Sequence, residues 1–584
     1  MKSNYDKTPK IKISESEDEI FVGWENIFKQ ISEKLSVVSG PSVTTLVIDT
    51  YQGVDDSEVQ TAIKQYLGPH SSYKSTAGFK DENSISEMVF PYVTDDRIFG
   101  YMTDLEMNDF FDPSRLRELK VQIEKDSSPL KVIYGPGARL CADADVLVYI
   151  DMSRWEIQQR MRSNELGNIG VSNNNIDVAR RYKQSYFVDW RMLDRHKMAI
   201  FEQVDIFIDA NKKQQPKGIS GEVLTQALEQ VNKQPFRVVP FFDPGPWGGQ
   251  WMKEVMDLDR STVNYAWSFD CVPEENSILL SFGEETFETP AINLTLREPT
   301  DLLGSYVTDK FGAEFPIRFD FLDTMKGGNL SLQVHPSKEY IKEKFGMPYT
   351  QDESYYMMAA EEGAVVYLGF KDDVQPEKFI SQLKEAQETG GHFDADKYVA
   401  KYVIKKHDHI LIPNGTVHCS GEDSVVLEIS ATPYIFTFKL WDWGRMGLDG
   451  LPRPINIEHG EKVIDWSRKE DFSKRELINK IEKVAEGDGW IEESTGLSPT
   501  VHIETRRHWF TGTAPHNTGG GVNVLNLVEG REAIVESPTG AFEPFIVHYA
   551  ETFIVPAAVG DYTIRPYGAS EGQKCATIKA YVRK

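Results

Sequence analysis

The sequence predicts a protein of several domains, in which an N-terminal α/β part with a parallel sheet precedes a mainly β part. Three observations lead to this fold class. The chain has 584 residues, which is too many for one ordinary core and indicates two to four domains. Up to about residue 230, strand-like and helix-like stretches alternate, as in a parallel α/β sheet. From Pro240 onward, short runs rich in Val, Ile, Thr and aromatic residues alternate with turn residues, which is typical of a β-sandwich or barrel.

The N-terminal part is expected to begin with a polar, frayed segment of about fifteen residues. An amphipathic helix is predicted from Trp24 to Leu35. The further predicted strands are 44–49, 131–134, 145–151 and 204–209, and the further predicted helices are 57–67 and 153–162. Ser153 precedes the last of these helices and Glu156 follows three residues later, which is the spacing of a capping box.

The mainly β part is expected to follow a linker that runs from Val231 to Val239. Helical insertions are predicted at 376–389, 395–400 and 472–485. From about Thr500, an all-β segment with turn glycines such as Gly519-Gly520-Gly521 predicts a second, smaller lobe. The predicted domains are therefore 1–235, 236–495 and 496–584.

Charge and cysteine content exclude several classes of function. The formal net charge is −26, whereas general binding to nucleic acids or anionic membranes needs a positive surface. A small phosphorylated substrate remains possible, because it needs only a local basic pocket. The four cysteines are far apart and form no CxxC motif, so neither a disulfide framework nor a cysteine zinc site is indicated. Neither a signal peptide nor a membrane span is recognisable, and we expect a cytoplasmic protein.

The most informative stretch is Leu332-Gln333-Val334-His335-Pro336. Side chains at i and i+2 of a β-strand share a face, so the Gln333 amide and the His335 imidazole can enter one cavity. His418 follows a Pro-Asn-Gly turn, and Glu353 lies between the two stretches. Two imidazoles, a carboxylate and an amide suit zinc best, with iron, manganese or cobalt as alternatives. Two other interpretations stay open on this evidence: histidines packed in a core, and a metal that only ties strands together.

The neighbouring motifs form an ordered series with these residues. The series is Pro246-Trp247-Gly248-Gly249, 315–323, Gln333-Val334-His335, Glu353, 363–369, 413–418 and Trp441-Asp442-Trp443-Gly444-Arg445. From about residue 240 to the C-terminus, this order resembles the type I phosphomannose isomerases, zinc enzymes of the cupin fold. The resemblance implies that Gln333, His335, Glu353 and His418 hold one Zn²⁺. It also implies mannose 6-phosphate and fructose 6-phosphate as substrates, and a smaller C-terminal lobe that is cupin-like. The histidines of that lobe do not repeat the ligand pattern, and no metal is expected there.

Two positions depart from the pattern of this family. Lys439 stands where the family usually has an essential arginine, and Gln351 stands where it often has a lysine. Lysine is a compact point charge and arginine a planar fork, so we expect Lys439 to neutralise a phosphate or an enediolate and Arg445 to supply the fork. The departures keep two other functions open. One is an isomerase or epimerase for another sugar or sugar phosphate, and the other is a sugar-sensing protein without turnover.

The N-terminal part resembles the P-loop nucleoside kinases of the uridine kinase type. The resemblance covers roughly residues 40 to 230 and rests on Tyr134-Gly135-Pro136-Gly137-Ala138 and on the stretch 145–162. A phosphate-binding loop needs glycines and a lysine that reaches the β- and γ-phosphates. Here the loop after Ile48 has no lysine, and Asp49, Asp55 and Asp56 would repel a triphosphate. We therefore expect a domain with the shape of a kinase but without kinase activity.

Overall fold

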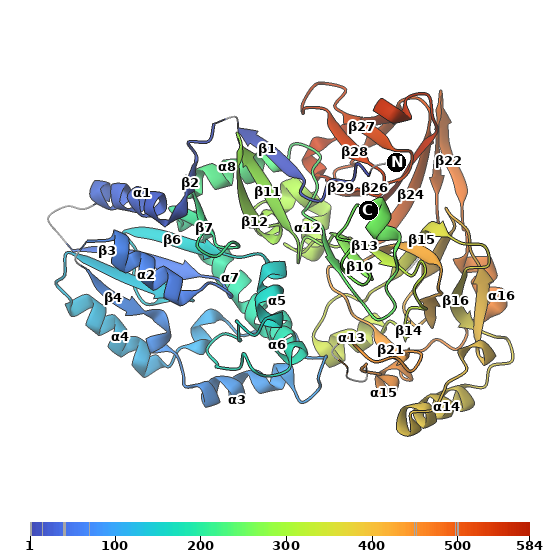
Figure 1. Cartoon of the computed structure of the whole chain (residues 1–584), viewed down its shortest axis with the longest axis horizontal. Helices are drawn as coiled ribbons and strands as arrows, with labels where there is room; N and C mark the ends of the chain where they lie inside the picture. The colour runs from blue at the N-terminus through green and yellow to red at the C-terminus, as the bar shows by residue number, and fades with distance from the viewer. Residues whose placement is uncertain are drawn as a thin grey trace.

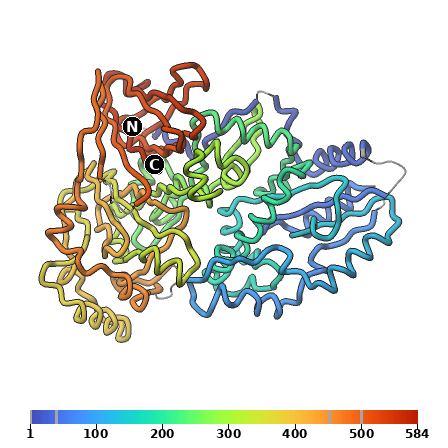
Figure 2. The backbone as a smooth tube through the Cα atoms, turned by 180° about the vertical axis from the view of Figure 1, so that it is seen from behind, coloured from blue at the N-terminus to red at the C-terminus, as the bar shows by residue number. Residues whose placement is uncertain are grey.

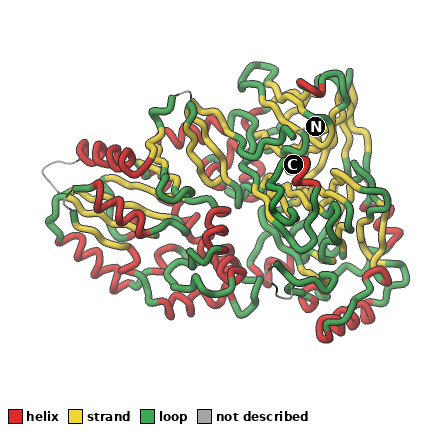
Figure 3. Tube along the Cα trace, viewed as in Figure 1, coloured by secondary structure: helices red, strands yellow, loops and turns green. Residues whose placement is uncertain are grey.

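The computed structural model describes residues 3–14, 16–38, 43–68, 70–448, 450, 453–496, 498 and 501–584. An α/β domain lies on one side of the molecule and two β lobes lie on the other (Figure 1). The same division is seen from behind, with the N-terminal domain beside the two lobes (Figure 2). Most long helices belong to the N-terminal half, whereas strands dominate the remainder (Figure 3). None of the described helices is both long and apolar enough to span a bilayer.

The N-terminal domain is built on a seven-stranded sheet in the order β2-β8-β7-β6-β3-β5-β4. Its strands are β2 (Ile20–Val22), β3 (Thr44–Thr50), β4 (Ser71–Lys74), β5 (Leu130–Gly135), β6 (Val146–Asp151), β7 (Ile206–Asp209) and β8 (Lys217–Ser220). Strands β4, β5, β3, β6 and β7 run parallel. At one edge β8 pairs antiparallel with β7, and β2 pairs antiparallel with β8. The predicted parallel sheet is present and contains all four predicted strands.

Helices cover both faces of this sheet, because its strands are apolar on both sides. The helices are α1 (Gly23–Val38), α2 (Asp56–Tyr66), α3 (Glu82–Val93), α4 (Pro113–Lys125), α5 (Arg154–Arg162), α6 (Val178–Gln184), α7 (Trp190–Ile200) and α8 (Gly221–Val231). Helices α1 and α2 form a separate core with alternate strand residues such as Leu46 and Ile48. Val47, Ile133 and Leu147 point to the opposite face and belong to a core that continues into the β lobes.

The first β lobe is a sandwich of two sheets. The six-stranded sheet has the order β18-β15-β20-β13-β10-β9, and the five-stranded sheet has the order β17-β16-β19-β14-β21. The strands of the first are β9 (Phe241–Asp243), β10 (Trp267–Cys271), β13 (Arg318–Asp323), β15 (Glu353–Ala360), β18 (His409–Ile412) and β20 (Ser424–Ser430). Those of the second are β14 (Leu332–Val334), β16 (Val365–Phe370), β17 (Val399–Val403), β19 (His418–Ser420) and β21 (Phe438–Trp441). Helical segments between the strands are α9 (Trp251–Val255), α10 (Ile292–Arg297), α11 (Pro299–Leu303), α12 (Ser305–Phe311), α13 (Lys338–Phe345), α14 (Pro376–Thr389), α15 (Ile457–Gly460) and α16 (Glu470–Phe472).

The second β lobe is a smaller sandwich with its own apolar core. One sheet has the order β22-β23-β24-β31-β26-β29, and the other has the order β25-β30-β27-β28. The strands are β22 (Glu482–Gly487), β23 (Trp490–Ser494), β24 (Ile503–Phe510), β25 (Ala514–Asn517), β26 (Asn523–Glu529), β27 (Glu532–Glu536), β28 (Phe545–His548), β29 (Thr552–Val555), β30 (Asp561–Pro566) and β31 (Cys575–Val582). Because β22 and β23 pair into this lobe before residue 496, we propose that it begins near Glu482. Thr500, where the last segment was expected to start, lies outside the described residues.

The N-terminal segment was expected to be frayed but is packed, and this prediction was wrong. In the N-terminal segment, Tyr5 is buried and β1 (Lys10–Ser14) adds to a sheet with β11 (Ser277–Phe282) and β12 (Glu285–Pro290). The expected linker from Val231 to Val239 begins at the end of α8 and then lies between the lobes. Arg237 in it is buried and pairs with Glu551 at 2.7 Å. Both segments therefore bind the domains together.

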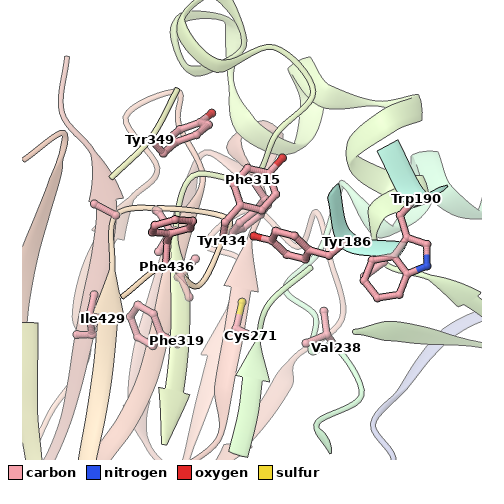
Figure 4. Packing of buried hydrophobic residues seen from close by; sticks show 14 of the residues in the cluster. Tyr186, Trp190, Val238, Cys271, Phe315, Phe319, Tyr349, Ile429, Tyr434 and Phe436 are labelled. Atoms are coloured by element: carbon pink, nitrogen blue, oxygen red, sulfur yellow. The ribbon is translucent and has the colours of Figure 1, made fainter. Parts of the chain in front are cut away.

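Aromatic side chains reinforce this contact between the domains. Tyr186, which lies between α6 and α7, points to Tyr434 of the first β lobe, with ring centroids 5.9 Å apart (Figure 4). Phe99 of the N-terminal domain packs against Phe436 and Phe438 at 4.9 and 5.3 Å. The N-terminal domain is thus joined to the first β lobe by a continuous apolar core.

Three helix predictions need correction. Residues 395–400 form only a short 3₁₀ turn (Ala395–Lys397) before β17 begins at Val399. Residues 472–485 form a turn of π-helix (Ser473–Leu477) followed by β22, because this stretch pairs with β23. Ser153 does occupy the N-cap position of α5, but its side chain makes no capping hydrogen bond. The helix predicted at 376–389 is present as α14.

Carboxylates occupy the backbone donors of the loop between β3 and α2 that a phosphate group would need. In a nucleotide-binding domain the phosphate occupies the helix N-terminus. Here the Asp55 carboxylate takes this place and accepts hydrogen bonds from the backbone N–H groups of Ser57 and Glu58. Gly53 packs so tightly that a Cβ atom there would lie 2.7 Å from Sδ of Met152. The Asp49 carboxylate accepts hydrogen bonds from the backbone of Gly137 and Arg139, both at 3.0 Å.

We therefore expect no productive binding of ATP to the N-terminal domain. Titration of the full-length protein with ATP and Mg²⁺ in a calorimeter should give no saturable heat. The physical reason is that carboxylates already occupy the backbone donors that a phosphate would need. Magnesium-dependent binding in the micromolar range would contradict this expectation.

Candidate metal centre

The four predicted ligands come from two facing sheets. Gln333 lies on β14 and His335 follows two residues later, so their side chains share a face. His418 opens β19 and lies opposite Gln333 in antiparallel register, and residues directly opposite each other also share a face. Glu353 opens β15 of the other sheet and reaches the same space. The register of the strands therefore brings the four side chains together.

The ligand atoms are close to one another and buried. His335, Glu353 and His418 offer atoms that all lie within 4.8 Å of one another, which no other group of three His, Cys, Asp or Glu residues in the described ranges does. Nε2 of His418 lies 2.8 Å from Oε1 of Glu353, and Nε2 of His335 lies 3.2 Å from Oε2. The amide nitrogen of Gln333 lies 3.2 Å from Nε2 of His418. A half-turn of this amide presents its oxygen at the same place.

Backbone carbonyls orient both imidazoles. Nδ1 of His335 lies 2.9 Å from the carbonyl oxygen of Phe436, and Nδ1 of His418 lies 2.9 Å from that of Thr416. A carbonyl can only accept, so each Nδ1 carries a proton and each Nε2 of a neutral ring presents a lone pair. Nε2 of His335 and Oε1 of Glu353 are buried without a hydrogen bond to any described residue. Two lone pairs and a carboxylate aimed at one point fit a divalent cation.

Electrostatic interactions couple these three groups. Burial disfavours the charged form of His335, but the Glu353 carboxylate outweighs it and raises the His335 pKa. Burial also opposes the charge on Glu353, yet the two histidines hold the pKa of this carboxyl well below its usual range. Glu353 is therefore ionised at neutral pH, as a metal ligand must be.

Gln351 connects the metal centre to a further carboxylate. Its Nε2 donates hydrogen bonds to Oε2 of Glu353 at 2.8 Å and to Oε1 of Glu428 at 3.0 Å. Its Oε1 accepts a hydrogen bond from the backbone N–H of Phe436 at 2.7 Å. The amide at this position, where the resemblance led us to look for a lysine, is thus fixed as a neutral bridge between two acids.

Glu428 is a site residue that the sequence interpretation missed. It lies on β20, opposite Tyr355 of β15, so its side chain shares the inner face with Glu353. It also lines the cavity beside the metal centre. Burial and the charge of Glu353 raise its pKa to about 7. One signal was available in the sequence: Glu428 is the single charged residue of the buried strand Ser424–Ser430.

A cavity of about 500 Å³ opens beside the metal centre. This size lies within the range of roughly 300–1,000 Å³ that is usual for small-molecule sites. Gln333, Gln351 and Glu428 line it near the ligands, and Arg318 and Arg453 lie in the same wall. The cavity can therefore hold a small polar molecule against the metal-binding face.

Of the two side chains predicted to be catalytic cations, Lys439 lines the cavity and Arg445 does not. Lys439 lies opposite Gln333 in the strand register, and it lines the cavity. Its ammonium makes no ion pair within the described part of the chain, and burial, together with nearby Arg453, lowers its pKa to about 8. Arg445 pairs with Asp442 at 2.6 Å and is not among the residues that line the cavity. The arginines that do line it are Arg162, Arg318 and Arg453.

Comparisons with known proteins find a family model for the N-terminal domain and, separately, similarity to mannose-6-phosphate isomerases. A family model described as a domain of unknown function, DUF8485, matches residues 23–233. A mannose-6-phosphate isomerase of Bacillus subtilis is 21% identical over 344 residues, which are 58% of this chain and 96% of that protein. A mannose-6-phosphate isomerase of Streptococcus mutans is 24% identical over 220 residues, 37% of this chain. This second match spans 64% of the relative, slightly less than two thirds of its length.

A solved structure gives a match of similar extent. The crystal structure of the mannose 6-phosphate isomerase of Bacillus subtilis aligns with a TM-score of 0.48 and 17% identity, over 60% of this chain and 99% of that one. The chain is thus similar in sequence to a mannose-6-phosphate isomerase over 58% of its length. The relatives support the predicted class of enzyme, an aldose–ketose isomerase. The likeness of the N-terminal part to nucleoside kinases stays a prediction.

Proposed function

We propose that this protein is a zinc-dependent aldose–ketose isomerase that interconverts mannose 6-phosphate and fructose 6-phosphate. The observation that carries the proposal is the group of Gln333, His335, Glu353 and His418, whose donor atoms converge beside a cavity with an unpaired lysine. The names of the relatives support the choice of substrate. Nitrogen and oxygen ligands without cysteine favour zinc, and other divalent metals stay possible.

The reaction moves one proton between C1 and C2 of the sugar. When bound, the metal would act as a Lewis acid toward the oxygens on these carbons. We assign the proton transfer to Glu428. Its carboxylate takes the proton from C2 of the aldose and returns it to C1 of the enediol, while the hydroxyl protons shift in the opposite sense. A carboxyl with a pKa of about 7 suits both directions, because it is populated in both protonation states near neutral pH.

We assign charge stabilisation to Lys439. Its ammonium lines the cavity, lies on the same face as Gln333, and has no carboxylate partner of its own among the described residues. A half-buried cation without a carboxylate partner is costly, and negative charge on the enediolate or the phosphate would compensate it. Arg453 lines the same cavity and offers a planar guanidinium group that can bind a phosphate through two hydrogen bonds. It also pairs with Asp442 at 2.9 Å.

The protein should contain about one divalent ion per chain when it is purified without added metal. His335→Ala should lower the metal content strongly, because it removes one of the two imidazole ligands. His409→Ala is a matched control, since His409 is also a buried histidine of the same lobe but lies outside the ligand group. Elemental analysis measures the content. Less than a tenth of an equivalent in the parent, with no uptake of added zinc, would contradict the proposal.

A second function has one observation in its favour. Gln351 replaces a possible cation with a neutral bridge, which leaves the cavity with less positive charge than the resemblance implied. Another sugar or a less charged sugar phosphate would then be the preferred substrate of the same metal centre. Assays with several aldoses and their phosphates separate this function from the first, and complete absence of turnover would favour a sugar-sensing protein.

A further inference from the structure

The N-terminal domain lines part of the cavity beside the metal centre. The lining residues of that domain include Phe99, Gln158, Met161, Arg162, Val178 and Tyr182. We call these residues the domain wall. They come from the loop after α3, from α5 and from α6, which are remote in sequence from the metal-binding strands. The cavity is therefore shared between two domains.

The domain wall is held firmly against the β lobe. Arg154 at the start of α5 is fully buried and pairs with Glu274 at 2.6 Å and with Asp194. Trp155, the next residue, stacks on Phe241 with ring centroids 4.2 Å apart. Buried ion pairs with well-placed hydrogen bonds are strongly destabilised when one partner is removed. The wall is therefore a fixed part of the cavity and has no feature of a swinging lid.

The domain wall differs in chemistry from the metal side. Its polar groups are already paired: Arg162 makes a bidentate contact with Asp243 at 2.8 and 2.7 Å, and the Tyr182 hydroxyl and the Gln158 amide donate to Glu275 at 3.4 and 2.9 Å. The surface that remains consists of the apolar and aromatic parts of Phe99, Met161 and Val178. The β-lobe side presents Lys439, Gln351 and Glu428 together with apolar residues such as Trp247 and Phe436. The charged groups near the metal centre therefore lie on the β-lobe side of the cavity.

We propose that the domain wall is a binding subsite that contacts the apolar C–H face of the sugar substrate and thereby helps to select it. This inference rests on the proposed isomerase function. A sugar hydroxyl placed against the domain wall would lose its hydrogen bonds to water without gaining one to the protein. A C–H face has no such hydrogen bonds to lose. The wall accordingly favours sugars whose polar groups all point toward the metal side. This gives the N-terminal domain a task in the isomerase reaction that needs no nucleotide.

A pair of substitutions tests the subsite. Val178 and Ile176 are both exposed apolar residues, at 38% and 45% of their surface, but only Val178 lines the cavity. Val178→Trp should therefore narrow the cavity and Ile176→Trp should not, while neither change disturbs a core. We expect Val178→Trp to raise KM for mannose 6-phosphate by about tenfold or more with kcat nearly unchanged, because contacts far from the reacting carbons act mainly on binding.

Three readouts keep the outcomes apart: KM, kcat and metal content. The proposal is supported when Val178→Trp raises KM, Ile176→Trp keeps the KM of the parent, and both retain its metal. It is overturned when Val178→Trp has the KM of the parent, and the proposed isomerase function then still stands. If the parent itself turns over no hexose phosphate, the proposed function is contradicted, and so is the subsite proposal that rests on it. A loss of kcat and metal in Val178→Trp would also contradict the proposal, because it would indicate a structural role.

Discussion

Glu428→Gln is expected to lower kcat by about a hundredfold or more, the usual size of a general acid–base contribution. The amide has nearly the same shape as the carboxylate, and its oxygen can still accept the hydrogen bonds that Gln351 and Ser430 donate at 3.0 and 2.7 Å. It cannot, however, take up and return the proton that moves between C1 and C2. Metal content should remain that of the parent, because Glu428 is not a ligand. The measurement is kcat in both directions of the isomerisation.

Glu422→Gln provides the control for this change. Glu422 is an exposed carboxylate in the turn before β20, and its substitution should leave turnover intact. If Glu428→Gln retains the kcat of the parent, Glu428 is not the base. The base would then have to be sought among other residues of the cavity.

Lys439→Ala is expected to lower turnover by about a hundredfold or more, since removal of one preorganised charge costs roughly 10²–10³ in kcat. Its position opposite Gln333 puts it on the strand face that carries this proposed metal ligand. The metal content should be retained, because a lysine ammonium carries no lone pair for the metal. Lys462→Ala, a change of an exposed lysine, is the control.

The pH dependence offers a second test of Lys439. Burial together with Arg453 lowers its pKa to about 8, so the ammonium is charged below this pH and loses its charge above it. Activity should therefore fall as the pH rises through about 8. In Lys439→Arg this alkaline limb should move upward, because a guanidinium stays protonated. If Lys439→Ala behaves like the parent and Arg453→Ala does not, the catalytic cation is Arg453.

The strands of the metal centre could be predicted because their signals are local. The spacing of Gln333 and His335 fixes a shared face within one strand, and the turn before His418 fixes the start of another. The structure brings these residues together with Glu353, and their role as ligands remains a proposal. The parallel sheet of the N-terminal domain was predictable for the same reason, since each of its central strands is an apolar run between helices.

The errors arose where distant partners decide the local structure. The stretch 472–485 contains residues that favour a helix, but pairing of β22 with β23 draws its second half into a sheet. The polar N-terminus becomes a strand only because β11, more than 260 residues later, offers it an edge. The burial of Arg237 within the predicted linker could not be seen in the sequence, because its partner, Glu551, belongs to another lobe.

The same limit explains what was missed at the site. Glu428 resembles a strand residue in an apolar run, and only the register with β15 places it near Glu353. The domain wall has no signal in the sequence, because Val178 and Met161 reach the cavity only through the docking of two domains. Local patterns predict elements, whereas a shared cavity depends on how those elements pack.

The central claim is that the metal centre catalyses aldose–ketose isomerisation. The most direct test is a coupled assay that follows formation of fructose 6-phosphate from mannose 6-phosphate by the purified full-length protein. We expect turnover in the parent, loss of turnover after treatment with a chelator, and recovery when zinc is added back. His335→Ala should show no turnover even with added zinc. Turnover that is unchanged by complete removal of the metal, or absence of turnover in the zinc-loaded parent, would contradict the claim.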